Sequence, residues 1–404
     1  MAGATPTTMD AALKETWTSD NIIEQLYNQN PLLQKIRKLK TTQVGQQAVT
    51  PVHTGRNWGY TALPAAGGTL NAAGNQGLAQ ATWNYTHHNA QIKIQGSAID
   101  GTQNDTLSVA EVVDLEVTGA LGDLERQLSR QLFMAGDALI TACGTTTTSA
   151  TVVLNVADGF NAIERGWLAV GSVVDIGTTA DETAIAVDRT LTAVTESSTA
   201  PTVVISGATV STTSSHYLSL ANNRLGATSY EMNGLDLVVD SASTVGGLTV
   251  ASNPTWASYE DSTSQALTLS LMYNANRKVM QKTGKPANYV VTGLKQQQRF
   301  YELVQAQVRF AGDSKLGAGN VDGVEFNGMT VYAQPDCKNE QMYFLTIGDL
   351  LLVSSGSPDW QNKQTGGKVL EWIQGEDAFG ARINCRHQLG CSRRNSHAKM
   401  TGLT

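Results

Sequence analysis

Residues 46 to 95 are the segment that most constrains the predicted fold, and they read QQAVTPVHTGRNWGYTALPAAGGTLNAAGNQGLAQATWNYTHHNAQIKIQ. The second part predicts a strand exposed on one face, because Trp83, Tyr85 and His87 alternate with polar residues. Before this strand lies a stretch rich in Gly, Ala and Asn, which is too poor in apolar residues for an isolated hairpin to be stable in water. A long loop in a compact chain is usually functional or disordered. We therefore interpret residues 46 to 95 as an extended arm supported by another subunit, with a disordered surface loop of a monomer as the alternative.

The strongest helix signal in the sequence follows this arm. Ser108 and Glu111 have the spacing of a capping box, and an apolar stripe continues from them to Gly136. About 28 residues at 1.5 Å per residue predict a rod of roughly 40 Å. The stripe consists of Val113, Val117, Leu121, Leu124, Leu128 and Leu132. The opposite face is expected to be solvated, which explains its charges without catalysis; it carries Asp114, Asp123, Glu125, Arg126 and Arg130.

The amino-terminal part is polar at first and then basic. Residues 1 to 20, rich in Thr and Ala, predict a flexible arm that becomes ordered against a neighbour. Apolar residues at helical spacing predict two short helices over 22–27 and 32–39, separated by Pro31. The second segment and the residue after it carry four positive charges without an acid, at Lys35, Arg37, Lys38 and Lys40. This charge fits a solvated helix face, or contact with DNA, a scaffold protein or an acidic neighbour.

Residues 140 to 250 have a different texture, rich in Thr, Ser, Val, Ala and Gly. Short β-branched runs between turn residues predict strands over 151–156, 170–176, 184–187, 202–205 and 235–239. They predict a small β domain inserted between helical parts.

The last third of the chain predicts a mixed sheet with helices on it. A helix over 264–282 ends at Gly284 and Pro286, and a strand over 288–292 leads into a helix over 295–307. Strands follow over 329–333, 342–345 and 350–353, and the chain ends in extended segments from Lys368. This alternation of strands and helices predicts an α+β architecture.

Composition and charge exclude several classes of protein. Of the 404 residues, 41% are apolar and only 16% charged, which is typical of a folded protein that buries surface against partners. The net charge of −7 is uneven, since residues 94 to 277 hold 6 Arg, no Lys and 20 Asp or Glu, a balance of −14. This acidic middle cannot bind nucleic acid, whereas the basic ends could contact DNA. The chain begins with no secretion signal and contains no membrane-spanning run, so we expect a soluble cytosolic protein.

Motifs for catalysis or metal binding are not recognisable. Neither of the Gly-Lys pairs, at 284–285 and 367–368, completes a phosphate-binding loop. The group of Cys385, His387 and Cys391 matches no standard zinc spacing, and the four cysteines of the chain are expected to be reduced thiols. His87 and His88 are neighbours on a predicted strand, so they face opposite sides and could not easily share a metal. We expect no enzyme activity, no cofactor and no metal.

The order of these segments resembles that of a known protein family. An amino-terminal arm, a long hairpin loop, a capped long helix, an α/β unit and an extended return follow one another, with the local sequences NPLL at 30–33, GMTVY at 328–332 and IGDLL at 347–351. In this arrangement the chain resembles, over nearly its whole length, major capsid proteins of tailed bacteriophages of the Hong Kong 97 type.

The resemblance implies a division of the chain. The N-terminal arm would comprise residues 1–45, the extended loop 46–100, and the peripheral domain with its spine helix 101–139. Residues 140–255 depart from the minimal family pattern and would form a β-rich insertion domain. The axial domain would comprise 256–367, and 368–404 would return to the peripheral domain.

The resemblance also implies a function. The protein would assemble with itself as pentamers and hexamers into the icosahedral shell that encloses the double-stranded DNA of a tailed phage. It would be assembled in the host bacterial cytoplasm and reside in the virion, away from membranes. Its further partners would be a portal protein at one vertex, scaffold and decoration proteins where these are used, and DNA through nonspecific contacts.

Candidate contact residues follow from this interpretation. The inter-subunit candidates are Arg56, Trp58, Tyr60, Trp83 and Tyr85. The candidates for contact with DNA or the shell lumen are Lys35, Arg37, Lys38, Lys40, Arg393 and Arg394. A phage tail or tube protein is an alternative, although the long helix after a long loop fits it poorly. A β-rich adhesin or carbohydrate-binding module is another, although it would normally have a secretion signal.

Overall fold

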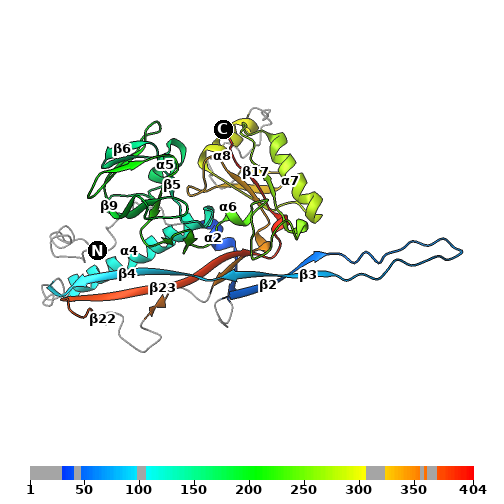
Figure 1. The fold of residues 1–404 in the computed structure, drawn as a ribbon, viewed down its shortest axis with the longest axis horizontal. Helices are drawn as coiled ribbons and strands as arrows, with labels where there is room; N and C mark the ends of the chain where they lie inside the picture. The colour runs from blue at the N-terminus through cyan, green and yellow to red at the C-terminus, as the bar shows by residue number, and fades with distance from the viewer. Residues whose placement is uncertain (1–29, 41–46, 98–105, 306–323, 355–358, 362–370) are drawn as a thin grey trace, which may run out of the picture.

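The computed structural model describes residues 30–40, 47–97, 106–305, 324–354, 359–361 and 371–404. A long β ribbon runs along one side of the molecule, and one long helix lies over it (Figure 1). Two compact parts stand on the helix side, and one hairpin projects far beyond them.

The ribbon belongs to a six-stranded sheet built from both ends of the chain. β4 (Thr86–Gln95) and β23 (Ala378–Cys391) pair antiparallel from Gln95 opposite Ala378 to Thr86 opposite His387. β20 (Leu350–Ser354) also pairs with β23 and is flanked by β1 (Arg37–Lys40), while β21 (Asp359–Trp360) and β22 (Glu371–Trp372) are short additions.

The long helix, α4 (Thr106–Phe133), is confirmed with 28 residues. It begins two residues before Ser108, so Ser108 lies inside the helix and is not its N-cap. Leu124, Leu128 and Leu132 are buried as the stripe predicts, whereas Leu121 of the same stripe is exposed. The side chains of Val113 and Val117 lie outside the described residues. The expectation that Arg130 is solvated was wrong, because its side chain is buried in an ion pair with Glu231.

The helix expected over 32–39 is shorter than predicted. α2 (Pro31–Lys35) is capped by the side chain of Asn30, which accepts hydrogen bonds from the backbone N–H groups of Leu32 and Leu33. Ile36 has extended backbone angles, and the next four residues form β1, which pairs in parallel with β20. Strand pairing therefore overrides the helical spacing. The helix expected over 22–27 lies outside the described residues.

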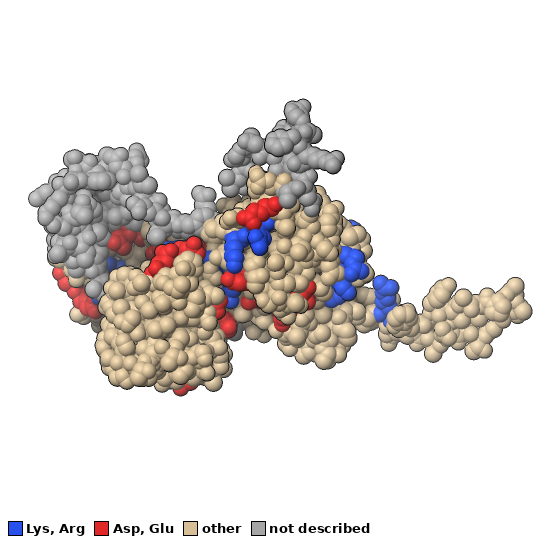
Figure 2. Space-filling model, turned by 90° about the horizontal axis from the view of Figure 1, so that it is seen from above, with Lys and Arg blue, Asp and Glu red and all other residues tan. Residues whose placement is uncertain are grey.

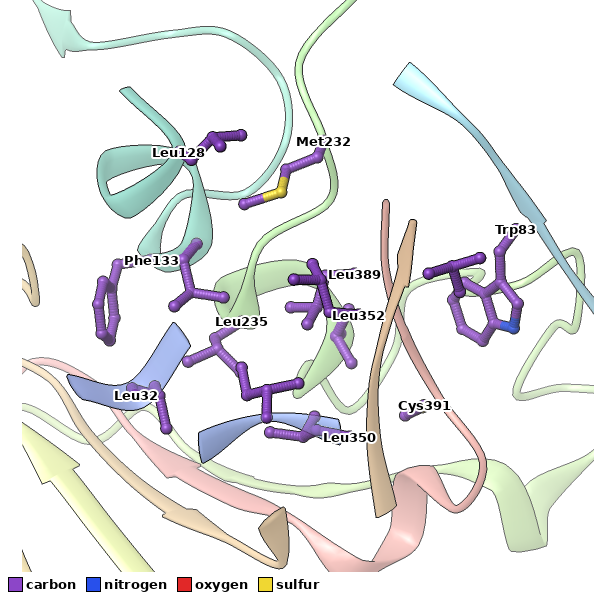
Figure 3. Close-up of a cluster of buried hydrophobic side chains, with 14 of the residues drawn as sticks. Leu32, Trp83, Leu128, Phe133, Met232, Leu235, Leu350, Leu352, Leu389 and Cys391 are labelled. Atoms are coloured by element: carbon purple, nitrogen blue, oxygen red, sulfur yellow. The ribbon is translucent and has the colours of Figure 1, made fainter. Parts of the chain in front are cut away.

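The main hydrophobic core lies between α4, α2 and the ribbon (Figure 3). It includes Leu32, Trp83, Leu128 and Leu352, which come from four different elements. α6 (Leu235–Val238) also packs here, so the strand predicted over 235–239 was wrong. A short apolar run that is buried all round does not distinguish a strand from one turn of helix.

Residues 140 to 220 have a core of their own. A sheet in the order β5-β12-β8-β9-β10-β7 closes on itself, since Cys143 bridges Leu154 and the backbone N of Gly144 donates to the carbonyl of Val153 at 2.7 Å. We call this unit the barrel. Its strands are β5 (Thr141–Ala142), β7 (Thr151–Val153), β8 (Val173–Gly177), β9 (Ala186–Thr195), β10 (Thr202–Ile205) and β12 (Tyr217–Leu220), with α5 (Val156–Glu164), β6 (Thr146–Ser149) and β11 (Val210–Thr212) beside them. The strand predicted over 151–156 ends early because Asn155 caps α5.

The third part is the predicted mixed sheet with helices. Its order is β15-β24-β19-β16-β18-β17, and α7 (Leu269–Thr283) ends at Gly284, whose φ of 77° suits a glycine. The other elements are α8 (Leu294–Gln305), β15 (Tyr259–Asp261), β16 (Tyr289–Thr292), β17 (Val324–Phe326), β18 (Met329–Ala333), β19 (Met342–Leu345) and β24 (Ala398–Met400). Lys399 of β24 joins this sheet to α6, because its ammonium group lies 3.0 Å from Asp236 and 3.2 Å from Glu260 in a nearly buried site.

Candidate assembly interface

The projecting hairpin consists of two paired strands and a long tip. β2 (Gln47–Gly55) and β3 (Gly77–Asn84) pair antiparallel, with Gln47 opposite Asn84 and His53 opposite Leu78. Arg56 follows β2, and residues 57 to 76 form the tip. In Figure 1 the hairpin extends well beyond the α7 side of the molecule.

The base of the hairpin is anchored in the main core. Ala48, Val52, Ala81 and Trp83 are buried there, and the indole N–H of Trp83 donates to the hydroxyl of Thr50 at 3.1 Å. The base therefore belongs to the fold of its own chain.

Among the described residues, the polar contacts of the tip are local. The side-chain oxygen of Asn57 accepts hydrogen bonds from the backbone N–H groups of Gly59 and Gly74, at 2.8 and 3.1 Å. Asn71 donates to the carbonyl of Tyr60 at 2.9 Å. These bonds connect the two sides of the tip across the hairpin, which gives it an extended shape without a hydrophobic core.

The apolar side chains of the hairpin outside its base are exposed. The exposed fractions are 81% for Trp58, 83% for Tyr60, 71% for Leu70 and 76% for Leu78. Residues 57 to 76 contain no charged side chain, and Figure 2 shows an arm whose only blue atoms lie near its base. Large exposed apolar side chains gathered on one projection are typical of a protein contact surface.

The predicted inter-subunit residues fall into two groups. Arg56, Trp58 and Tyr60 are exposed on the hairpin. Trp83 is only 1% exposed and cannot contact a neighbour, and Tyr85 is half-buried against the main core. Sequence reasoning missed Val49, Leu70 and Leu78. The exposure of Val49 and Leu78 depends on which face of the paired strands meets the core, and Leu70 lies in the tip beyond it.

The predicted DNA-contact residues are also divided by the structure. Arg394 is fully buried, and its guanidinium donates to three backbone carbonyls, including those of Val238 at 3.1 Å and Ser243 at 2.8 Å. A contact between Arg394 and DNA is therefore excluded in this fold. Arg393 is exposed.

The ammonium group of Lys35 lies over the rings of Tyr289 and Tyr332, at 4.8 and 4.6 Å from their centroids. This position ties α2 to the third part through cation–π contacts. The backbones of Arg37, Lys38 and Lys40 form β1, and their side chains lie outside the described residues.

The described residues contain no group of three metal-ligating side chains close enough to hold an ion. Burial raises the pKa of the thiols of Cys385 and Cys391 to about 12, which keeps them protonated. Within the same described ranges, no helix is long and apolar enough to cross a membrane.

Comparison with known proteins bears on the fold. No family model matches the chain, and no curated protein matches its sequence. The solved capsid asymmetric unit of cyanophage A-1(L) matches with a TM-score of 0.60 at 13% identity, over 98% of this chain and 99% of that one. The capsid of the native GTA particle matches with a TM-score of 0.51 at 11% identity, over 100% of both chains. The chain therefore has the mixed α and β fold of these phage and GTA capsid proteins, as the resemblance predicted.

Proposed function

We propose that this chain is the major capsid protein of a tailed phage, assembling as pentamers and hexamers into the shell around double-stranded DNA. The observation that carries the proposal is the exposed, uncharged part of the hairpin, residues 57 to 76, whose apolar side chains are not covered by the described residues of their own chain. A sister subunit would supply the missing apolar surface. The whole-length likeness to capsid proteins supports this proposal.

Shell formation follows from contacts between copies and needs no reaction. Each contact can be weak, because many copies act together. Contacts between unlike surfaces of identical subunits form closed rings when the rotation closes, and small movements of the hairpin and α4 would allow rings of five and of six. DNA would be contained sterically, with nonspecific contact from basic side chains such as Arg393. A portal protein and, where used, scaffold and decoration proteins remain proposed partners.

We keep the proposed division of the chain with one change. The bounds outside the insertion domain stay as the sequence predicted them. They are 1–45 for the N-terminal arm, 46–100 for the extended loop, 101–139 for the peripheral domain, 256–367 for the axial domain and 368–404 for the carboxyl-terminal return. The insertion domain would end near Tyr230, because Met232, Leu235 and Val239 pack in the main core and not in the barrel. We place assembly in the bacterial cytoplasm and the finished protein in the virion.

The test removes the tip and leaves its anchored base. Deleting all of residues 46 to 95 would also remove Trp83 and β4, which complete the main core and the ribbon. A variant in which residues 57–75 are replaced by Asn-Gly should instead fold with an unchanged urea unfolding midpoint and form no shells in electron micrographs. Normal shells from this variant would refute the proposal.

Point substitutions provide a matched control. Trp58→Ala combined with Tyr60→Ala should give folded subunits that do not assemble, because both rings are exposed in the subunit. Trp58→Phe combined with Tyr60→Phe keeps an aromatic ring at each position and should retain assembly. Equal assembly of the two pairs would show that the rings do not make the contact.

A further inference from the structure

A group of basic side chains lies at the base of the hairpin, and we call it the basic rim. The hydroxyl of Thr255, in η2 (Pro254–Trp256), donates to the carbonyl of Thr54 at 2.9 Å, so η2 lies against β2 next to Arg56. Lys282, in the last turn of α7, donates to two carbonyls just after η2, at 2.8 and 3.0 Å. The end of α7 and the start of the hairpin tip therefore meet at η2. The basic rim consists of Arg56, Lys278, Lys282 and Lys285.

The rim is accessible and its surroundings are positive. Arg56, Lys282 and Lys285 are exposed. Burial, followed by the positive charges of Arg394 and Lys278, lowers the pKa of Lys282. The dipole of α7 accounts for a cation at the end of this helix, but not for Arg56, which belongs to another segment.

Acidic side chains near the rim are few and mostly paired. Residues 256 to 305 hold 6 Lys or Arg and 3 Asp or Glu. Two of these acids form ion pairs, Glu260 with Lys399 and Glu302 with Arg299. The charge of the rim is therefore not balanced by the segment that carries it.

An acidic surface of the same chain lies on α4 and the barrel. Residues 106 to 230 hold 5 Arg, no Lys and 13 Asp or Glu, a balance of −8. The guanidinium of Arg126 on α4 donates to the carbonyls of Arg165 and Gly166 at 3.1 and 2.6 Å, so α4 lies against the end of α5. Glu125 and Glu164, which we call the acidic side, are therefore exposed on adjoining segments.

The basic rim and the acidic side cannot meet within one copy. In Figure 1 the hairpin leaves on the α7 side, whereas α5 and the barrel lie on the other side of the molecule. Figure 2 shows blue atoms at the hairpin base and red atoms around the barrel. Two copies placed head to tail would bring the two surfaces together, and contacts between unlike surfaces form rings when the rotation closes.

We propose that the basic rim docks against the acidic side of a second copy of this chain, with Arg56 and Lys285 facing Glu125 and Glu164. This docking rests on the proposed function and names the partner surface of the assembly. The hairpin starts at the rim, so a sister subunit held by the hairpin lies beside it. Nucleic acid is another polyanion that the rim could bind, but it would leave the acidic side without a partner. Opposite charges steer the two surfaces as they approach, and the apolar tip then holds them.

Charge reversal in the full chain tests the docking. Arg56→Glu combined with Lys285→Glu should slow shell formation about tenfold at about 0.1 M NaCl, followed by light scattering and electron microscopy. Raising NaCl to about 1 M shortens the screening length to about 3 Å, so it should slow the unaltered protein and accelerate this variant. Adding Glu125→Lys and Glu164→Lys to the same chain restores opposite charges on the two surfaces and should restore the rate.

A matched control makes the same change of charge away from the rim. Lys295 and Arg299 are exposed on α8, so Lys295→Glu combined with Arg299→Glu should form shells at the unaltered rate. Slow assembly of the rim variant, with recovery in the variant that carries all four changes, supports the docking. An unaltered rate in the rim variant, an equal loss in the α8 control, or no recovery would overturn it.

Two further measurements separate the explanations. If the rim variant forms normal shells but binds a short DNA duplex more weakly in fluorescence anisotropy, the rim belongs to nucleic acid and the docking is wrong. Sedimentation velocity detects self-association of any kind. Its absence in the unaltered protein would refute both the proposed function and the docking, whereas self-association that the rim variant leaves unchanged would refute the docking alone.

Discussion

The indole N–H of Trp167 donates to a carboxylate oxygen of Asp336 across a distance of 3.0 Å. Trp167 belongs to the core of the barrel, and Asp336 follows β18 in the third part. The other oxygen of Asp336 accepts from the hydroxyl of Ser129 of α4, which in turn accepts from the side chain of Asn30 at 2.7 Å. One buried carboxylate thus connects α2, α4, the barrel and the mixed sheet.

Asp336→Ala should destabilise the protein by about 2–4 kcal/mol, because two buried donors would lose their acceptor. Urea unfolding followed by circular dichroism measures this change. Glu196→Gln, which alters an exposed carboxylate of the barrel, should change the free energy of unfolding by less than about 0.5 kcal/mol. Equal stability of Asp336→Ala and the unaltered protein would contradict the connecting role.

Arg394→Ala should cost about 3–5 kcal/mol, since three backbone carbonyls, of which that of Val238 makes a fully buried bond, lose a charged donor. The neighbouring Arg393 is exposed, so Arg393→Ala should cost less than about 0.5 kcal/mol. Thermal unfolding of the two variants under identical conditions compares them directly. Similar melting temperatures would show that Arg394 is not structural.

His397 should make stability fall in acid. Burial lowers the pKa of His397 in the folded protein from 6.5 to about 3. Between these two pH values the imidazole is protonated in the unfolded chain and neutral in the folded one. The contribution is complete above about pH 6.5 and is lost as the pH falls toward 3, at about 1.4 kcal/mol per pH unit. His88 adds a similar slope between 6.5 and about 4.

Urea unfolding of His397→Gln between pH 7.5 and 5 checks this expectation. Relative to the unaltered protein, the slope of unfolding free energy against pH should be nearly unchanged above about pH 7 and should decrease by up to about 1.4 kcal/mol per unit toward pH 5. An unchanged slope would mean that His397 is protonated in the folded state or accessible to water.

Gly390→Ala should destabilise the ribbon by about 1–3 kcal/mol, because a Cβ at this position would lie 2.7 Å from the indole of Trp83. Trp83→Phe removes part of the ring and should cost stability alone. Combined with Gly390→Ala, its cost should be less than the sum of the two single changes. Strict additivity in urea unfolding would show that the two residues do not contact each other.

Periodicity predicted the long elements of this fold well. Leu124, Leu128 and Leu132 repeat at helical spacing and lie buried on α4, and the strand over 329–333 has its predicted bounds. These signals are local, since each element buries one face along its own length. The exposed rings of Trp58 and Tyr60 were predicted differently, from the interpretation of their segment as an arm that contacts another subunit.

The failures concern contacts between distant segments. Arg394 was predicted to be a free cation, but the fold places the carbonyl of Val238 in α6 against it. Arg130 was predicted to be solvated, but it pairs with Glu231, which is 101 residues away in sequence. Trp83 seemed available to a neighbour because its partner, Gly390, is remote in sequence. Burial of a polar or aromatic side chain by a distant segment leaves no periodic signal.

The uncharged hairpin tip has a consequence for the environment in which shells persist. Ionic screening weakens attractions between charges, and residues 57 to 76 have none to screen. An intersubunit contact made by this tip would be as stable at high ionic strength as at low ionic strength. Salts that are excluded from protein surfaces would strengthen it.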